Sequence, residues 1–237
     1  MIIYNKMTTT ICIPTTSRNR DWKKYNETYL YQTLKGFEKT DGDIRFYIGY
    51  DSDDILWSQQ DQRWGINAVI PLNITWYPMT CPKGDVVSIW NHLAGQAFMD
   101  GSEWIYAMGD DIGIPKDIGW LNILKKALGK RLGIAGGDSG NPAIPMTQFL
   151  VHKKHHDLFG YIFNPKLENW FADNYICWLY GSDKKQSSHY HYFNSIKLPN
   201  IGGDPRYVPN VQDGTLALAL ARRDIKFLRK HIQKENH

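Results

Sequence analysis

Residues 104–111 read WIYAMGDD, an apolar run from Trp104 to Met108 that leads through Gly109 into two carboxylates, Asp110 and Asp111. The apolar run is typical of a buried strand. In an open α/β sheet, ligands bind beyond the carboxyl ends of the strands, which is where both aspartates would lie. We therefore interpret this segment as a central strand with a candidate ligand site at its end.

Two adjacent carboxylates after an apolar strand repel each other and lose hydration, and a divalent cation is the usual compensation. Such a hard ion takes few protein oxygens and leaves coordination positions open for substrate phosphates. Asp-Asp pairs also form turns, and Asp111-Ile112-Gly113 taken alone is equally consistent with a turn. Polar segments after two other strands shift the balance towards a ligand site.

Strands and helices alternate on both sides of this segment. Strands are predicted at residues 9–14, 44–50, 72–77, 132–135 and 148–151, and helices around residues 29–37, 55–64, 85–99, 120–128 and 212–232. This alternation predicts one α/β domain around a mainly parallel sheet.

The first two predicted strands also end in polar segments. After the first come residues 15–20 (TTSRNR), whose hydroxyl and guanidinium groups can hold a nucleotide or a diphosphate. After the second come three acids, Asp51, Asp53 and Asp54. The carboxyl ends of parallel strands meet at one edge of a sheet, so these groups are expected near Asp110.

The composition is that of an ordinary globular protein. Of 237 residues, 42% are hydrophobic and 22% charged, which excludes a disordered chain. Lys and Arg number 28 against 24 Asp and Glu, and a formal charge of +4 gives no electrostatic case for a nucleic-acid partner. Aromatic residues reach 14%. Such rings build a core or stack on bases and on the apolar faces of sugars.

The three cysteines, Cys12, Cys81 and Cys177, form no CxxC pair, so neither a disulfide framework nor a zinc site is expected. The opening residues lack a signal-peptide apolar run, and no stretch approaches the ~20 apolar residues of a membrane span. We therefore expect a cytoplasmic protein without a transmembrane segment. The last predicted helix carries a cluster of cations, which we interpret as a solvated face rather than a membrane-surface contact. These cations are Arg222, Arg223, Lys226, Arg229 and Lys230.

In order and spacing, these segments resemble the nucleotide-sugar glycosyltransferases of the GT-A fold, which carry a short acidic DxD-type motif after their fourth core strand. The resemblance runs through ICIPTTSRNR, YIGYDSDD, SIWNHLAGQAF, SEWIYAMGDD and FGYIFNPKLENWFADNYICWLYG. The last of these, with residues 151–157 (VHKKHHD), looks like the capsid glycosyltransferases of large DNA viruses of the chlorella-virus type.

The resemblance implies one GT-A-like domain over residues 1–237, with a nucleotide-binding half at about 8–111 and an acceptor-binding half at about 112–237. For a viral protein, the compartment would be the host cytoplasm.

The resemblance also implies a Mn²⁺ or Mg²⁺ cofactor. The metal-binding acid of the family's motif falls on Asp111, and the preceding acid, Asp110, would contact the ribose or reach the metal through water. Gly109 departs from the pattern, because the first motif position is an acid in the family. Family members often supply one late histidine to the metal, which points to His191, with His189 as the alternative. A surface β-hairpin is the competing interpretation of that stretch, which precedes an Arg-Tyr pair at residues 206–207.

Several positions match the family's nucleotide site. Trp90 stands where the family often has a basic residue before an asparagine, so only the asparagine is carried over. The positions implied to contact the nucleotide are Thr15, Thr16, Arg18, Asp51, Asn91 and Asp110.

The second half of the chain is implied to bind the acceptor. Asp173 matches the catalytic base of inverting enzymes, and Glu168 is the runner-up, with a helix-start carboxylate as its competing interpretation. Trp170 is the expected stacking platform for a sugar ring, ahead of Trp178. Residues 136–138 (GGD) follow a predicted strand and resemble a loop at the donor-sugar end of the site, so Gly137 and Asp138 are implied substrate contacts.

These features predict a metal-dependent glycosyltransferase that moves a sugar from a nucleoside diphosphate, with UDP favoured, to a hydroxyl of a glycan or glycoprotein. Retention and inversion both stay open. One alternative is a sugar-phosphate nucleotidyltransferase, although residues 15–20 lack the glycines of its phosphate loop. Another is a non-catalytic sugar- or nucleotide-binding domain in which the acids hold a structural cation.

Overall fold

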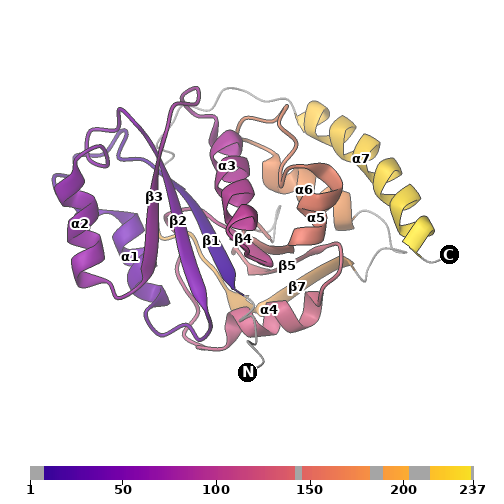
Figure 1. Ribbon diagram of the computed structural model, residues 1–237, viewed down its shortest axis with the longest axis horizontal. Coiled ribbons are helices and arrows are strands. Elements are labelled where there is room, and N and C mark those ends of the chain that lie inside the picture. The colour runs from indigo at the N-terminus through magenta and orange to yellow at the C-terminus, as the bar shows by residue number, and fades with distance from the viewer. Residues whose placement is uncertain (1–7, 142–145, 182–188, 203–213, 236–237) are drawn as a thin grey trace.

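The computed structural model describes residues 8–141, 146–181, 189–202 and 214–235. Its centre is a seven-stranded sheet with helices on both faces (Figure 1). The strands are β1 (Thr9–Thr15), β2 (Ile44–Asp51), β3 (Asn73–Met79), β4 (Trp104–Ala107), β5 (Ile134–Asp138), β6 (Phe149–His152) and β7 (Tyr190–Lys197). The helices are η1 (Tyr25–Glu27), α1 (Tyr29–Phe37), α2 (Gln60–Val69), α3 (Val86–Met99), α4 (Trp120–Leu128), α5 (Lys153–Phe159), α6 (Ala172–Gly181) and α7 (Gly214–Glu235).

The strand order is β3-β2-β1-β4-β6-β5-β7. Strand β1 runs parallel to β2 and β4, β2 runs parallel to β3, and β5 runs parallel to β7. Strand β6 is antiparallel to both of its neighbours, β4 and β5. The predicted α/β architecture with a mainly parallel sheet is confirmed. The carboxyl ends of β1, β2, β3, β4, β5 and β7 therefore meet at one edge of the sheet.

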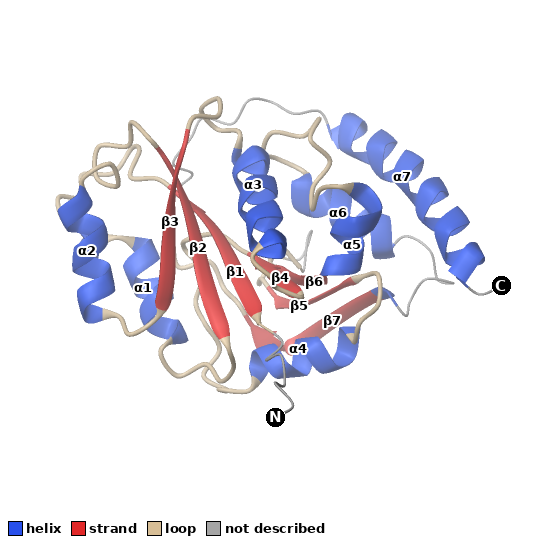
Figure 2. Ribbon diagram, viewed as in Figure 1, coloured by secondary structure: helices blue, strands red, loops and turns tan. Residues whose placement is uncertain are grey.

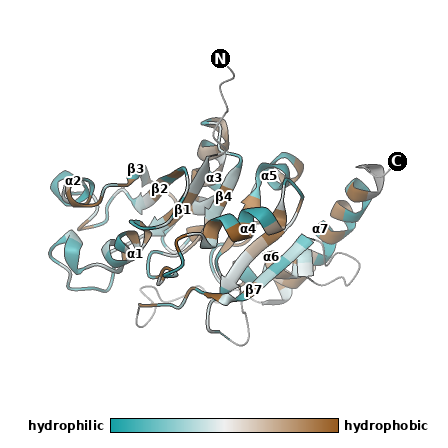
Figure 3. Cartoon of the chain, turned by 90° about the horizontal axis from the view of Figure 1, so that it is seen from below, coloured by the Kyte–Doolittle hydropathy of each residue, from teal (hydrophilic) through white to brown (hydrophobic). Residues whose placement is uncertain are grey.

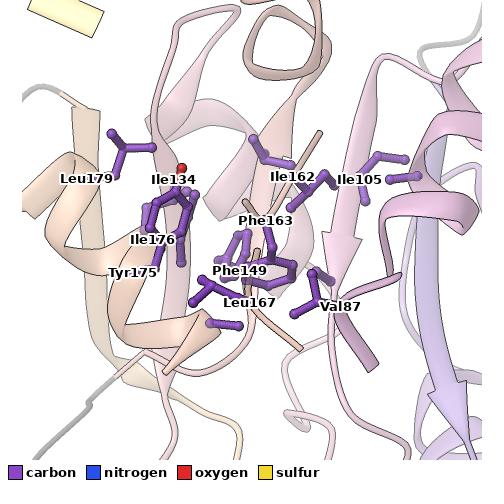
Figure 4. Packing of buried hydrophobic residues seen from close by; sticks show 14 of the residues in the cluster. Val87, Ile105, Ile134, Phe149, Ile162, Phe163, Leu167, Tyr175, Ile176 and Leu179 are labelled. Carbon is purple, nitrogen blue, oxygen red and sulfur yellow. The ribbon is translucent and has the colours of Figure 1, made fainter. Parts of the chain in front are cut away.

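Both faces of the sheet are covered, which explains its continuous apolar strands. Strands β1, β4 and β6 are buried along their whole length. Helices α3, α6 and α7 pack on one face, and α1, α2 and α4 on the other (Figure 2). Alternate residues of β4 divide between the two sides: Ile105 joins the α3–α6 side, whereas Trp104 and Tyr106 join the α1–α4 side. Figure 4 shows Ile105 in the same cluster of buried side chains as Ile162, Phe163 and Val87.

Three segments differ from the sequence-based expectation. The helix expected around residues 55–64 begins only at Gln60, because the backbone of residues 56–58 is tied to Asp54. Residues 136–138 end strand β5 rather than forming a loop. The stretch that contains His191 is strand β7, which pairs parallel with β5 and is therefore not a hairpin. The Arg206-Tyr207 pair lies outside the described residues.

Helix α7 is fastened to the rest of the fold by a buried carboxylate. Oδ2 of Asp224 accepts hydrogen bonds from Tyr175 Oη at 2.8 Å, Asn164 Nδ2 at 3.0 Å and Tyr161 Oη at 3.1 Å. Arg223 Nε donates to Oδ1 at 2.7 Å. Burial by itself would raise the pKa of Asp224, but these donors outweigh it and the pKa lies below its usual value. Within the described ranges, no helix is long and apolar enough to cross a bilayer.

We expect Asp224→Ala to lower the free energy of unfolding by about 2 to 3 kcal/mol, because it leaves two tyrosine hydroxyls and an amide without their acceptor. Urea denaturation followed by tryptophan fluorescence measures this. Asp157→Ala, which removes an exposed acid from α5, is the control and should have little effect. Equal stability of the two variants would contradict the role given to Asp224.

Candidate active site

The ends of β1 and β4 are joined by a buried hydrogen bond at the carboxyl edge of the sheet. Thr15 Oγ1 donates to Asp110 Oδ2 at 2.5 Å, although the two residues are 95 positions apart in the chain. Asp110 is 1% exposed and Thr15 4% exposed. A carboxylate so far from water needs such a partner. The structure therefore brings together two of the residues that the sequence assigned to the nucleotide.

Asp54 organises the loop after β1. Its carboxylate accepts hydrogen bonds from Thr16 Oγ1 at 2.9 Å, from Ser17 N at 2.7 Å and from Ser17 Oγ at 2.6 Å. It also accepts from the backbone N–H groups of Leu56 and Trp57. The sequence placed Asp54 in an acidic segment but gave it no role. An acid that follows a buried strand and faces a hydroxyl-rich loop is the signal that points to this one.

Four charged side chains meet beside that loop. Arg18 Nε lies 3.1 Å from Asp51 Oδ2, and Arg18 Nη2 lies 3.2 Å from Asp53 Oδ1. Lys83 also contacts Asp53, and its Nζ lies 3.7 Å from Asp51 Oδ2. The hydrogen bond from Lys83 lowers the pKa of Asp53.

Lys83 was not singled out from the sequence, yet it follows β3 and reaches the same edge. The side chains of Arg18 and Lys83 are 33% and 46% exposed, so both cations are open to an anionic ligand.

The turn that carries Asp111 is fixed from two sides. From α1, Thr33 Oγ1 lies 3.0 Å from the carbonyl oxygens of Asp110 and Ile112 and accepts from Ile112 N at 3.1 Å. From the segment after β7, Ile201 N donates to the Asp111 carbonyl at 2.8 Å. Asp111 is thus held between the end of β4 and residues 199–202.

Two glycines leave room around the Asp111 carboxylate. A Cβ atom at Gly202 would stand 2.5 Å from Asp111 Oδ2, and one at Gly109 would stand 3.0 Å from Oδ1. Any side chain at position 109 would therefore crowd this carboxylate. This is a physical reason why a glycine stands here, where the GT-A family has an acid. Asn200 Nδ2 lies 3.3 Å from Oδ2. The Asp111 carboxylate is only partly buried, and one such oxygen donor fits a hard divalent cation that takes most of its ligands from phosphate and water.

The structure does not bring His191 to Asp111. Ala135 of β5 pairs with both His191 and Leu150, and Leu150 pairs with Tyr106 of β4. His191 therefore lies level with Tyr106, four residues before Asp110, which is roughly 13 Å along the strands. The alternative, His189, lies two residues before His191 and just outside β7, where its Nδ1 contacts the carbonyl oxygen of Leu132. Within the part of the chain that the structure describes, no group of three His, Cys, Asp or Glu residues could hold a metal.

Asn91 and Trp90 both make contacts within the protein. Asn91 Oδ1 accepts from Ile162 N and Phe163 N, each at 3.0 Å, and its Nδ2 donates to the Phe163 carbonyl at 2.8 Å. Trp90 Nε1 donates to the Met108 carbonyl at 3.3 Å. Helix α3 therefore ties the end of β4 to the segment that leads into α6.

The glycines of β5 approach neighbouring strands closely. A Cβ atom at Gly136 would meet the Gln148 carbonyl oxygen at 2.4 Å, and one at Gly137 would meet the Ile196 carbonyl oxygen at 2.3 Å. Sheet packing therefore accounts for both glycines, whereas the sequence suggested a ligand-facing loop. Asp138 accepts from Lys197 Nζ at 2.6 Å, and this bond lowers the pKa of the carboxyl group.

Asp173, in the second half of the chain, lies in the first turn of α6. Asn174 N donates to Asp173 Oδ1 at 2.8 Å. Burial nevertheless raises the pKa of Asp173, because its carboxylate loses hydration there. A carboxyl group with a raised pKa is characteristic of sites that take up protons. It therefore remains a candidate base.

The segment before α6 lies at the same edge as the nucleotide residues, since the Glu168 carbonyl accepts from Val87 N at the start of α3 at 3.0 Å. The Glu168 side chain is exposed, and Trp170 is 48% exposed. Phe171 has a φ of +66°, a left-handed conformation that a bulky residue adopts only under constraint. A strained residue thus separates the exposed Trp170 ring from the helix of Asp173.

No known protein family matches the sequence, and no curated protein matches it. Solved structures do match the fold. The mannosyltransferase of Pyrobaculum calidifontis in complex with GDP-Man and Mn²⁺ aligns with a TM-score of 0.58 at 13% identity, over 98% of this chain. This chain spans only 65% of the length of that mannosyltransferase.

Two further structures align over nearly their whole length. One, from Desulfovibrio desulfuricans, is described as a nucleotide-diphospho-sugar transferase (TM-score 0.50, 12% identity, 95% of this chain and 98% of that one). The other is a cytidylyltransferase from Leptospira borgpetersenii (TM-score 0.51, 9% identity, 94% and 96%). The fold is GT-A. At these identities the likeness shows the fold alone.

We expect Asp54→Ala to lower the free energy of unfolding by about 3 kcal/mol, because three side-chain or backbone donors of the β1 loop lose a buried charged acceptor. Chemical denaturation measures the loss. Asp53→Ala is the matched control, since Asp53 is a neighbouring but exposed acid, and its unfolding midpoint should stay close to that of the wild type. A small effect of Asp54→Ala would show that this loop is held by other contacts.

Proposed function

We infer that the protein is a metal-dependent glycosyltransferase that uses a nucleoside-diphosphate sugar, with a UDP-sugar as the first donor to test. The observation that carries this inference is the Asp110–Asp111 turn at the carboxyl edge of a GT-A sheet. Asp110 is bonded there to Thr15, and Asp111 lies in a cradle between two glycines. The acceptor class is a hydroxyl of a glycan or glycoprotein, as the resemblance to viral capsid glycosyltransferases suggests.

The donor would lie across the ends of β1, β2 and β4. Asp51 would meet the ribose or base, and Arg18 and Lys83, which now pair with Asp51, would contact the diphosphate once it displaces that carboxylate. Asp111 is the residue that would hold Mn²⁺ or Mg²⁺. Such an ion supplies positive charge that offsets the negative charge on the departing diphosphate.

Asp173 would act on the acceptor. In an inverting reaction the acceptor oxygen attacks the anomeric carbon, the bond to the diphosphate breaks, and the acceptor proton passes to the Asp173 carboxylate. Its raised pKa makes that carboxylate a stronger base than an exposed aspartate. The exposed Trp170 ring offers a stacking surface for a sugar. In a retaining reaction, Asp173 would instead orient the acceptor or stabilise positive charge on the donor sugar.

Asp111→Asn is expected to reduce release of the nucleoside diphosphate from a UDP- or GDP-sugar in the presence of Mn²⁺ by at least about 100-fold. The substitution keeps the side-chain size and removes the charge that would bind the cation. Asp157→Asn, at an exposed position of α5, is the control and should keep full activity. Unchanged release by Asp111→Asn would refute the metal site.

Asp173→Asn is expected to lower the activity and to raise the stability of the protein. If Asp173 is the base, activity falls by about a thousandfold, and wild-type activity declines on the acid side with a midpoint above the ordinary aspartate pKa of about 4. At pH 7 the folded state bears the cost of a buried charge, so the variant should melt at a higher temperature than the wild type. That gain should shrink as the pH falls through the raised folded-state pKa and disappear below the unfolded-state pKa of about 4, where the carboxyl group is protonated in both states. A variant that is less stable and fully active would contradict this assignment.

The cytidylyltransferase neighbour makes a nucleotidyltransferase the second candidate. That reaction joins a sugar phosphate to a nucleoside triphosphate and releases pyrophosphate, so measuring pyrophosphate from the same preparation separates the two activities. Residues 15–20 contain no glycine, and Asp54 fixes this loop through side chains, which favours the glycosyltransferase. Binding of a nucleotide sugar without either product would indicate the non-catalytic alternative.

A further inference from the structure

Helix α7 carries an excess of positive charge. Its 22 residues contain six Lys and Arg against two acids, and this excess equals the formal charge of +4 of the whole sequence. One of the two acids, Asp224, is buried and bonded to its neighbours. The rest of the protein is therefore close to neutral, whereas one helix is strongly cationic.

The cations lie on the side of α7 that faces away from the protein. Ala217, Ala221 and Leu228 are fully buried in the core that α7 shares with α6. Figure 1 shows α7 as the outermost element beside α5 and α6, with its long axis on the surface. The outward residues Arg222, Lys226, Arg229 and Lys230 are exposed, and Arg223 reaches out beside them while bonded to Asp224. We call these five cations, with Phe227, the basic face of α7.

Apolar side chains are exposed along the same helix. Phe227 is 51% exposed and Leu216 is 41% exposed. They are eleven residues apart, about three helical turns, so both project from the same side of α7. The Phe227 ring also lies 5.8 Å from the ring of Phe159 on α5. Figure 3 shows hydrophilic and hydrophobic residues alternating along α7.

The sequence alone favoured a solvated face for these cations, but the exposed Phe227 and Leu216 beside them change that interpretation. We propose that the basic face of α7 docks on an anionic phospholipid surface. Lysines and arginines with an exposed Phe and Leu among them are the pattern of helices that lie at a lipid interface, where cations meet headgroup phosphates and apolar side chains enter the acyl boundary. A nucleic acid or an acidic protein would also attract the cations. Exposed apolar side chains favour lipid, because a phosphate backbone offers them no partner.

Docking through α7 would set the orientation of the acceptor-binding half of the chain relative to the lipid surface. The helix begins beside Phe171, whose ring would be 3.0 Å from a Cβ atom at Gly214. Phe171 in turn precedes the helix that carries Asp173. The proposal is independent of the reaction catalysed, since it concerns only the outer surface of α7.

The test is co-sedimentation of the full chain with vesicles of phosphatidylcholine, with and without roughly 30% phosphatidylserine. The protein should bind the anionic vesicles only, and binding should weaken as salt rises. The double variant Lys226→Gln, Lys230→Gln should bind about 25-fold more weakly, at about fivefold per cation. Phe227→Ser should also bind more weakly while keeping the salt dependence.

The matched control is Lys39→Gln, Lys126→Gln, which removes two exposed lysines from other surfaces and should bind like the wild type. Circular dichroism confirms that each variant is folded. Absence of binding, equal binding to neutral vesicles, or equal losses in the control pair would overturn the proposal. Tighter binding to polyglutamate or to duplex DNA than to anionic vesicles would replace the lipid with a protein or nucleic-acid partner.

Discussion

Burying a carboxylate is unfavourable unless donors replace its lost water, and two such carboxylates hold the carboxyl edge of this sheet together. Asp110 is satisfied by Thr15, and Asp54 by the hydroxyl and N–H groups of Thr16 and Ser17. The first interaction ties the end of β1 to the turn after β4, and the second ties the loop after β1 to the segment after β2. The positions of Arg18 and of the acidic turn at Asp111 both depend on these bonds. The site therefore exists because the polar residues that build its walls are paired with one another.

Local pattern was enough to predict most of the elements and the edge at which the polar groups meet. Apolar runs predicted six of the seven strands, and the step from Met108 to Asp110 located the acidic turn. The features that local pattern did not indicate depended on contacts between distant segments. Only the pairing of β5 with β7 shows that His191 lies well short of Asp111, and only the packing of neighbouring strands explains Gly136 and Gly137. Lys83 carries no local signal, because a lone exposed lysine in a loop has no periodicity.

Neutral hydrogen bonds made by α3 join the two halves of the proposed site. Asn91 links α3 to the backbone at Phe163, and Val87 N at the start of α3 binds the Glu168 carbonyl. Helix α3 is thus shared by the nucleotide side and the acceptor side. These bonds do not titrate, so changes of pH would act on the relative position of the halves through titratable groups such as Asp173 and Asp224.

The reversed direction of β6 has a consequence for how the chain folds. Residues 9–107 supply β3, β2, β1 and β4, which are contiguous in the sheet and all parallel. During synthesis this half can assemble before the rest of the chain has emerged, and it then presents β4 as an unpaired apolar edge. Strand β6 covers that edge more than forty residues later, with β5 already made. The nascent protein is therefore most prone to aggregation after β4 has been synthesised and before β6 has. The edge that is then unprotected is β4, the strand that leads into Asp110.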